Sequence, residues 1–148
     1  MRVVLALLAA ICLVGTAVAY TKIQYNNGDE ILRMLQLYDG KTYVMFFYDA
    51  PGANRDLRTI NDYYKDRLKS EILEPNPDEP TEYMYAEIDA TDYYGNGYLV
   101  DRLNVTRDSL KEKPNIVVMK DGKGNVIYGP TAMNSVQTSL EKLSQPPE

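Results

Sequence analysis

The sequence predicts a single α/β domain in which helices cover both faces of a mixed sheet, and three observations lead to this fold class. The chain has 148 residues, enough for one domain with one continuous core. Its first part alternates apolar strands with amphipathic helices in the order β-α-β-α-β, which is typical of parallel strands joined by crossover connections. Its last part is a β-hairpin followed by a helix. We therefore expect a domain over residues 20–145 and a tail at 146–148.

The first elements are predicted from the spacing of apolar residues. A short strand at residues 22–25 precedes a turn and helix-start signal at residues 26–29 (NNGD). Apolar residues then recur at helical spacing from Ile31 to Tyr38, which predicts a helix that ends before residues 39–40. Residues 43–48 (YVMFFY) form a continuous apolar run, as expected for a strand buried on both faces. Apolar residues then recur at steps of three or four over residues 57–72, which predicts an amphipathic helix of about five turns.

A loop with three prolines at residues 74–82 precedes the next strand, which we expect at 83–88. The acidic side chains of residues 71–82 lack the spacing of a calcium-binding loop, so we expect a solvated loop rather than a metal site. Residues 95–97 (GNG) lack the ending of a phosphate-binding loop and are interpreted as a turn. A shorter helix is expected around residues 99–103.

The C-terminal elements are a hairpin and a helix. Residues 115–119 and 126–128 are predicted to pair as strands around a turn at 121–125, whose glycines favour a tight hairpin. Asn134 can cap the last helix, because Gln137 follows three residues later, and apolar residues at helical spacing continue to Leu143. The resulting order is β-α-β-α-β-α-β-β-α.

Residues 3–21 form an uncharged N-terminal run after Arg2, and two interpretations of this run stay open. A secretory signal peptide would end at the small-residue site 17–19 (AVA), so that residues 1–19 are removed. An uncleaved membrane anchor is the alternative, because the run would span about 28 Å as a helix, close to the thickness of the hydrocarbon core. In either case we expect the domain to face a lumen, an extracellular space or an intermembrane space.

The composition excludes several classes of function. The chain has no histidine, and Cys12 in the N-terminal run is the single cysteine. This excludes, for the folded part, Ser-His-Asp and Cys-His catalysis, Cys/His zinc sites, His- or Cys-held haem, Cys-ligated iron–sulfur clusters and dithiol exchange. Lysine and arginine number 16 against 21 aspartate and glutamate, a net charge of −5. A nucleic-acid backbone would be repelled, so we expect no nucleic-acid partner, and also no cofactor or metal.

Four segments spread over residues 41–143 resemble the thioredoxin fold, and in particular a protein disulfide isomerase domain. They occur in the family's order. They are 45–51 (MFFYDAP), similar to the strand before the cysteine motif in "EFYAPWCGHC"; 86–91 (AEIDAT), similar to "AKVDAT"; 99–105 (LVDRLNV), similar to "LAKRYGV"; and 113–122 (KPNIVVMKDG), similar to "YPTIKFFKNG".

The departures from the family's pattern concern its redox site. In the family that the sequence resembles, two cysteines lie at the start of the second helix. The corresponding residues of this chain contain no sulfur; they are Pro51, Gly52, Ala53, Asn54, Arg55 and Asp56. The family's buried acid falls at Phe46, where an aromatic ring is expected to pack instead. We therefore expect a redox-inactive domain that is not an enzyme. The residues 51–56, with Lys113 and Pro114, form what we call the vacant corner, a possible contact surface.

Pro114 resembles the cis-proline that faces the family's active site, which implies a cis bond here. The family has three residues between the valine at Val105 and this proline, whereas this chain has eight, Thr106 to Lys113. The extra segment is either an inconsequential surface loop or a charged contact surface that covers the peptide-binding groove. The spacing leaves both open.

The chain has 13 tyrosines, and some are candidates for a contact surface. Tyr93 and Tyr94 are the strongest candidates, and Tyr63 and Tyr98 are also expected to be partly exposed. Core or core-edge positions are expected for Tyr43, Tyr48, Tyr64 and Tyr83. Asn104 begins an N-glycosylation sequon, which would be used only in a secretory compartment and is equally well explained by chance.

Three functions follow as hypotheses. The first is a non-catalytic accessory subunit of a larger complex, with protein partners, anchored by residues 3–21 in an endomembrane or the mitochondrial inner membrane. The second is a soluble, redox-inactive, protein disulfide isomerase-like protein that binds clients in the secretory pathway. The C-terminal Gln-Pro-Pro-Glu lacks an endoplasmic-reticulum retrieval signal, which favours the first. An enzyme using Asp, Glu, Lys or Tyr ranks last, because no paired constellation supports it.

Overall fold

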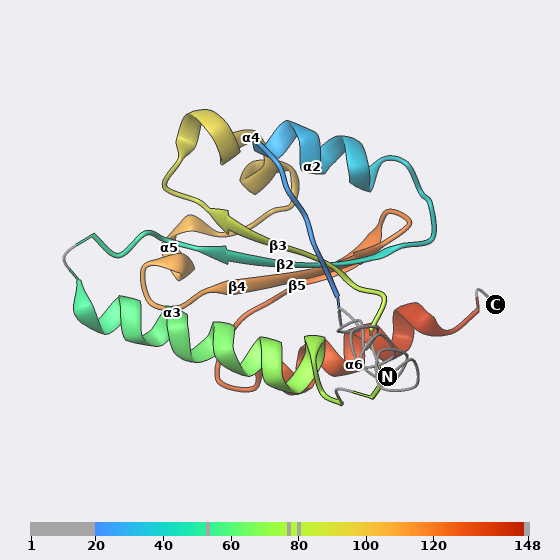
Figure 1. The fold of residues 1–148 in the computed structure, drawn as a ribbon. Coiled ribbons are helices and arrows are strands. Elements are labelled where there is room, and N and C mark those ends of the chain that lie inside the picture. The colour runs from blue at the N-terminus through green and yellow to red at the C-terminus, as the bar shows by residue number, and fades with distance from the viewer. Residues whose placement is uncertain (1–19, 53, 77, 80, 147–148) are drawn as a thin grey trace, which may run out of the picture.

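A computed structural model describes residues 20–52, 54–76, 78–79 and 81–146, and its centre is a five-stranded sheet in the order β1-β3-β2-β4-β5 (Figure 1). The strands are β1 (Thr21–Lys22), β2 (Thr42–Tyr48), β3 (Met84–Asp89), β4 (Asn115–Lys120) and β5 (Lys123–Ile127). The helices are α2 (Gly28–Leu35), α3 (Arg55–Leu68), α4 (Tyr93–Arg102), α5 (Arg107–Leu110) and α6 (Ala132–Ser144), and a π-helix, η1 (Lys69–Leu73), continues α3.

The sheet is mixed, as predicted. Strand β3 runs parallel to both β1 and β2, whereas β4 is antiparallel to β2 and β5 is antiparallel to β4. The hairpin between β4 and β5 turns at Asp121 and Gly122, which both have positive φ angles, of 48° and 76°. Two such residues in sequence match the tight turn that suits twisted strands, so β5 starts earlier than the expected 126–128.

Two hydrophobic cores lie on opposite faces of β2, because successive side chains of a strand point to opposite sides. Helices α2 and α4 cover one face and α3 and α6 the other (Figure 1). Phe47 packs with the first pair of helices through residues such as Ile31 and Leu99. Phe46 packs with the second pair through residues such as Leu68 and Val136. The continuous apolar run of β2 is thus explained by burial on both faces.

The prediction of a turn at residues 95–97 is wrong, because these residues lie inside α4. Asp92 caps this helix by accepting a hydrogen bond from the Gly95 amide at 2.9 Å. Asn96 is buried and donates to the Asp89 carbonyl at 3.0 Å, which ties the helix to the end of β3. Capping and packing therefore outweigh the low helix propensity of the two glycines.

Two helix boundaries also differ from the prediction. Helix α2 begins as expected, since Asn27 accepts from the Glu30 amide, but it ends at Leu35 rather than at Tyr38. Tyr38 is exposed and has a φ of 47°, so it has left the helix. Asn134 does not cap α6, which begins two residues earlier, at Ala132. Ala132 is buried in the core, so side-chain packing places this boundary.

The expected N-terminal hydrophobic helix falls on residues 1–19, which lie outside the described residues. Signal peptide and membrane anchor therefore both stay predictions. Within the part of the chain that the structure describes, no helix has the length and apolar character needed to cross a membrane.

Gly28 is expected to be required for the packing of α2 on α4. A Cβ atom there would lie 2.7 Å from Leu99 Cβ and 3.3 Å from Asn96 Cα, so Gly28→Ala must push the helices apart. We expect a loss of about 1–3 kcal/mol in the free energy of unfolding. Gly97→Ala is the matched control, because its nearest neighbour is Arg107 Nη2 at 3.6 Å. There the gain in helix propensity should stabilise the fold by about 0.5–1 kcal/mol in urea unfolding; equal effects of the two substitutions would contradict this packing.

Candidate functional site

The vacant corner lies where β2 ends and α3 begins. Asn54 caps α3, and its Oδ1 accepts hydrogen bonds from the amides of Asp56 and Leu57, each at 3.1 Å. Arg58 Nη2 donates to the Gly52 carbonyl at 3.1 Å, which connects α3 to the loop that precedes it. In the thiol enzymes that the sequence resembles, helix-start amides favour a thiolate. Here the chain's own Asn54 side chain accepts from two of these amides.

The other predicted corner residues are distributed around this loop. Arg55 and Asp56 are exposed in the first turn of α3, and Pro51 is half-buried. Lys113 is half-buried and Pro114 is buried, directly before β4. Ala53 lies outside the described residues. Nothing in this set offers a nucleophile in the family's position.

Phe46 packs as predicted where the family would have a buried acid. Its side chain is 1% exposed, and its ring lies 6.2 Å from that of Tyr48. A carboxylate in this position would lose its hydration without a proton-transfer role to justify the cost. The aromatic residue instead fills the space between β2 and the helices α3 and α6.

Two buried asparagines hold the ends of neighbouring strands at this corner. Asn61 on α3 donates from Nδ2 to the carbonyl of Asp49, and Asn96 on α4 donates in the same way to the carbonyl of Asp89. The asparagines are 6% and 5% exposed, and the Oδ1 atom of each has no hydrogen-bond partner among the described residues. Sequence reasoning missed both, because asparagine on a helix gives no signal of burial.

A cleft of about 120 Å³ lies under α3 next to the corner. Its lining is Phe46, Tyr48, Pro51, Arg58, Asn61, Asp62, Lys65 and Glu87. Lys65 pairs with Asp62 at 3.5 Å, and Glu87 pairs with Lys69 at 3.5 Å. Burial raises the pKa of Tyr48, and the Asp89 and Glu87 carboxylates act in the same direction. The phenol of Tyr48 therefore stays protonated at neutral pH.

The described residues also contain no cluster of three or more side chains that could ligate a metal ion. The acidic residues of the 71–82 segment include Glu71, which pairs with Arg67. This pairing is on the surface and fits the expected solvated segment.

The expectation of a cis bond before Pro114 is wrong, because the described residues contain no cis peptide bond. Residues 106–113 precede Pro114 directly. Their last turn closes through hydrogen bonds from the Glu112 and Lys113 amides to the Ser109 carbonyl, both at 3.1 Å. The chain thus reaches β4 from a short helix, α5, rather than from the family's three-residue connection.

The insertion is an ordered element and not a free loop. Leu110 of α5 is buried in the core below α2 and α4. Arg107 forms an ion pair with Asp101 at 2.8 Å, donates to the Gly97 carbonyl at 3.3 Å and places its guanidinium carbon 5.0 Å from the centre of the Tyr93 ring. Three contacts from one side chain therefore attach α5 to α4.

Lys111 forms an ion pair within the insertion. Its Nζ donates to Asp108 at 3.0 Å, and this carboxylate raises the pKa of Lys111. Tyr93 and Asp49 act on the pKa of Lys111 in the same direction, more weakly. The Lys111 side chain is exposed to solvent.

The exposed tyrosines of α4 lie beside this insertion. Tyr93, Tyr94 and Tyr98 are all exposed, Tyr94 fully, and we call them the α4 tyrosine patch. Tyr63 on α3 is exposed as well, as the sequence predicted. The expected core and core-edge positions are also confirmed: Tyr43 is buried, and half-buried positions are found for Tyr48, Tyr64 and Tyr83.

Asn104 lies just beyond the end of α4. It is exposed, has a φ of 55° and donates its amide hydrogen to the Asp101 carbonyl at 3.2 Å. Asparagine tolerates this left-handed conformation well, which gives the residue a structural role at the helix end. Its glycosylation stays a prediction.

Asn61→Asp tests the hydrogen bond from Asn61 on α3 to the Asp49 carbonyl, just after the end of β2. The new carboxylate cannot donate to the Asp49 carbonyl, so we expect a loss of about 3 kcal/mol in unfolding free energy at neutral pH. Burial raises the pKa of the introduced carboxyl in the folded state. The loss is therefore full above that folded-state pKa and shrinks as the pH falls toward the unfolded-state value of about 3.9.

The measurement is urea unfolding of both chains at pH 7 and pH 5. Asn134→Asp is the control, because Asn134 is exposed on α6 and the change should stay within about 0.5 kcal/mol. A loss at Asn61 that is as small as in the control, or that is independent of pH, would show that the hydrogen bond does not hold the strand end.

Comparisons with known proteins find likeness in solved structures alone, since no protein-family model and no curated protein matches the chain. A chain in a crystal structure of ferredoxin:thioredoxin reductase with thioredoxin f2 has TM-score 0.52 and 15% identity, covering 88% of this chain and 100% of that chain. A crystal structure of thioredoxin from Trypanosoma brucei brucei matches with a TM-score of 0.51 and 11% sequence identity, over 88% of this chain and 96% of that chain. The short form of thioredoxin f from spinach chloroplast matches with a TM-score of 0.51 and 12% sequence identity, over 88% of this chain and 98% of that chain. Identities this low show the fold alone. The protein has a thioredoxin-like fold.

Proposed function

We propose that this protein is a non-catalytic interaction subunit, held at a membrane by residues 3–21 and belonging to a larger complex. The observation that carries the proposal is the attachment of α5 to α4 through Arg107, beside three exposed tyrosines. The insertion thereby joins the α4 tyrosine patch to the vacant corner. We call this combined surface the contact face: the α4 tyrosine patch, residues 106–113 and the vacant corner.

The chemistry of the contact face suits a protein partner. Tyrosine and arginine are enriched where protein interfaces are energetically strongest, because they bury large areas with few rotatable bonds. Arg107 is already fixed on Tyr93, so little side-chain entropy is lost when a partner covers them. The absence of cysteine from residues 20–148 leaves no thiol for redox catalysis at the corner.

The client-binding alternative has less support. Its peptide groove, by the resemblance to protein disulfide isomerase, would lie at Pro114. Pro114 is buried and follows directly on the turn that ends the insertion. A fixed partner on the contact face agrees better with this arrangement than a groove that accepts many unfolded chains.

Tyr94→Ala should weaken the association with the partner without affecting the fold. Tyr94 is fully exposed, so its loss removes no internal packing. If it is an interface anchor, its truncation should cost about 2 kcal/mol of binding, or about thirtyfold in affinity. The test is co-purification from native membranes with quantitative mass spectrometry, and Tyr63→Ala is the matched control on α3. Equal recovery of partner with both variants would contradict the assignment of the contact face.

The anchor predicts that the native protein stays in the membrane fraction during carbonate extraction and that its intact mass begins at or near Met1. A run of this length partitions stably into a bilayer, whereas a cleaved signal peptide leaves a domain without an anchor. A mass that begins at Tyr20, together with recovery as a free monomer, would overturn the membrane-subunit proposal.

A further inference from the structure

Strand β5 is an open edge of the sheet. It pairs with β4 on one side, and no described residue pairs with the backbone of residues 123–128 on the other side. In an antiparallel pair, alternate residues direct both N–H and C=O outward, so this edge presents unpaired donors and acceptors. At about 3.4 Å per residue, the five residues of β5 offer an edge of about 17 Å. The opposite edge, β1, has two residues.

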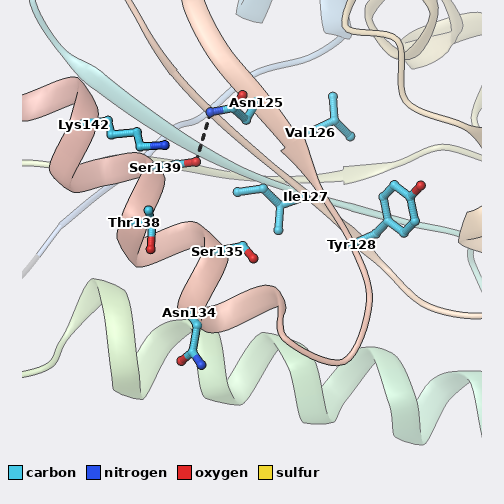
Figure 2. A pocket seen from close by; sticks show the side chains of 9 residues that line it. All are labelled: Asn125, Val126, Ile127, Tyr128, Asn134, Ser135, Thr138, Ser139 and Lys142. Carbon is cyan, nitrogen blue, oxygen red and sulfur yellow. Dashed lines mark hydrogen bonds between the residues drawn. The ribbon is translucent and has the colours of Figure 1, made fainter.

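A groove of about 480 Å³ runs along this edge between β5 and α6 (Figure 2). Asn125 and Ile127 of β5 point toward α6, where Asn125 donates to Ser139 Oγ at 3.0 Å. The helix side of the groove carries short polar side chains and one lysine: Asn134, Ser135, Thr138, Ser139 and Lys142. Small side chains leave room beside β5 for another strand, and their hydroxyl and amide groups can bond with polar side chains of that strand.

The charge of the groove indicates the occupant. Lys142 is the one charged residue among those that line it, and it is exposed. Lys123 begins the same edge strand and is exposed too. An added strand with carboxylates on its α6 side would therefore meet positive charge, in a chain whose net charge is −5. The β5 sequence KGNVI has no acidic residue, so the equivalent strand of a second copy would not supply one.

We propose that this groove binds an extended segment of a partner protein, which adds to β5 as a sixth strand and directs acidic side chains toward Lys142. Backbone hydrogen bonds to the outward-facing residues of β5 provide affinity, and the α6 wall selects polar and acidic side chains at every second position. The groove is separate from the contact face, which is built on α4 and α5. Binding at β5 therefore stands or falls independently of the α4 tyrosine patch.

The test uses the full-length chain in detergent micelles and the synthetic peptide Thr-Glu-Thr-Glu-Thr-Glu-Thr with blocked ends. The readout is amide hydrogen exchange by NMR. Alternate amides of β5 should exchange about tenfold more slowly when the peptide is at about ten times its dissociation constant. The amides of β1 should be unaffected. Two peptides methylated on alternate backbone nitrogens, in opposite phases, provide the control. The peptide whose N–H groups facing β5 are methylated should lose this protection, whereas the peptide methylated on its outward nitrogens should keep it.

The charge is tested by substitution. Lys142→Glu should weaken binding of the acidic peptide by about three- to fivefold and improve binding of the same peptide with Lys in place of Glu. Lys111→Glu, an exposed charge reversal on α5, should change neither value.

Four results would overturn the proposal. The first is that the two N-methylated peptides bind with equal affinity, and the second is that the peptide protects only amides outside β5. The third is that no amide of β5 is protected at about 10 mM peptide. The fourth is that the protection of β5 amides rises with protein concentration in the absence of peptide. The last result would assign the groove to a second copy of this chain. None of these results bears on the loss of partner expected for Tyr94→Ala, so failure of the two proposals can be told apart.

Discussion

The burial of β2 on both faces is the constraint on which the rest of this structure depends. Phe46 and Phe47 are adjacent in the chain but belong to different cores, and each fully buried aromatic ring contributes about 1.5–3 kcal/mol through the hydrophobic effect. Two layers of helices are needed to cover them, which determines where α3 and α4 start. Because parallel strands β2 and β3 end at the same end of the sheet, α3 and α4 both start from that end, on opposite faces. The vacant corner and the α4 tyrosine patch lie toward the same end of the sheet for that reason.

Hydrogen bonds and packing hold the described residues around the corner. Asn54 uses the amides that would face a thiolate, Phe46 fills the place of a buried acid, and Asn61 and Asn96 hold the ends of the two strands. Each replacement satisfies a backbone group or removes a charge from the interior. The insertion before Pro114 then adds a short helix that is fixed on α4 by Arg107.

Much of this fold can be predicted from the sequence, because strong periodicity reports burial directly. The run of residues 43–48 and the spacing over 57–72 predict β2 and α3 correctly, and four short resemblances predict the thioredoxin-like fold. Local turn signals are less reliable: the glycines of residues 95–97 lie in a helix because Asp92 caps it and Asn96 is buried. The hydrogen bond from Asn61 to the Asp49 carbonyl depends on how α3 packs against the end of β2. No local pattern carries that information.

The central claim is that the contact face meets one fixed partner, and photocrosslinking in the native cells tests it most directly. A photoreactive phenylalanine analogue would replace Tyr94 and, as a control, Tyr63, both of which are exposed. The account predicts crosslinking at position 94 to a single polypeptide that co-purifies at constant stoichiometry, and no such product at position 63. A broad distribution of crosslinked polypeptides at position 94 would identify a client-binding protein instead. No crosslink at position 94 in the intact membrane would contradict the contact face itself.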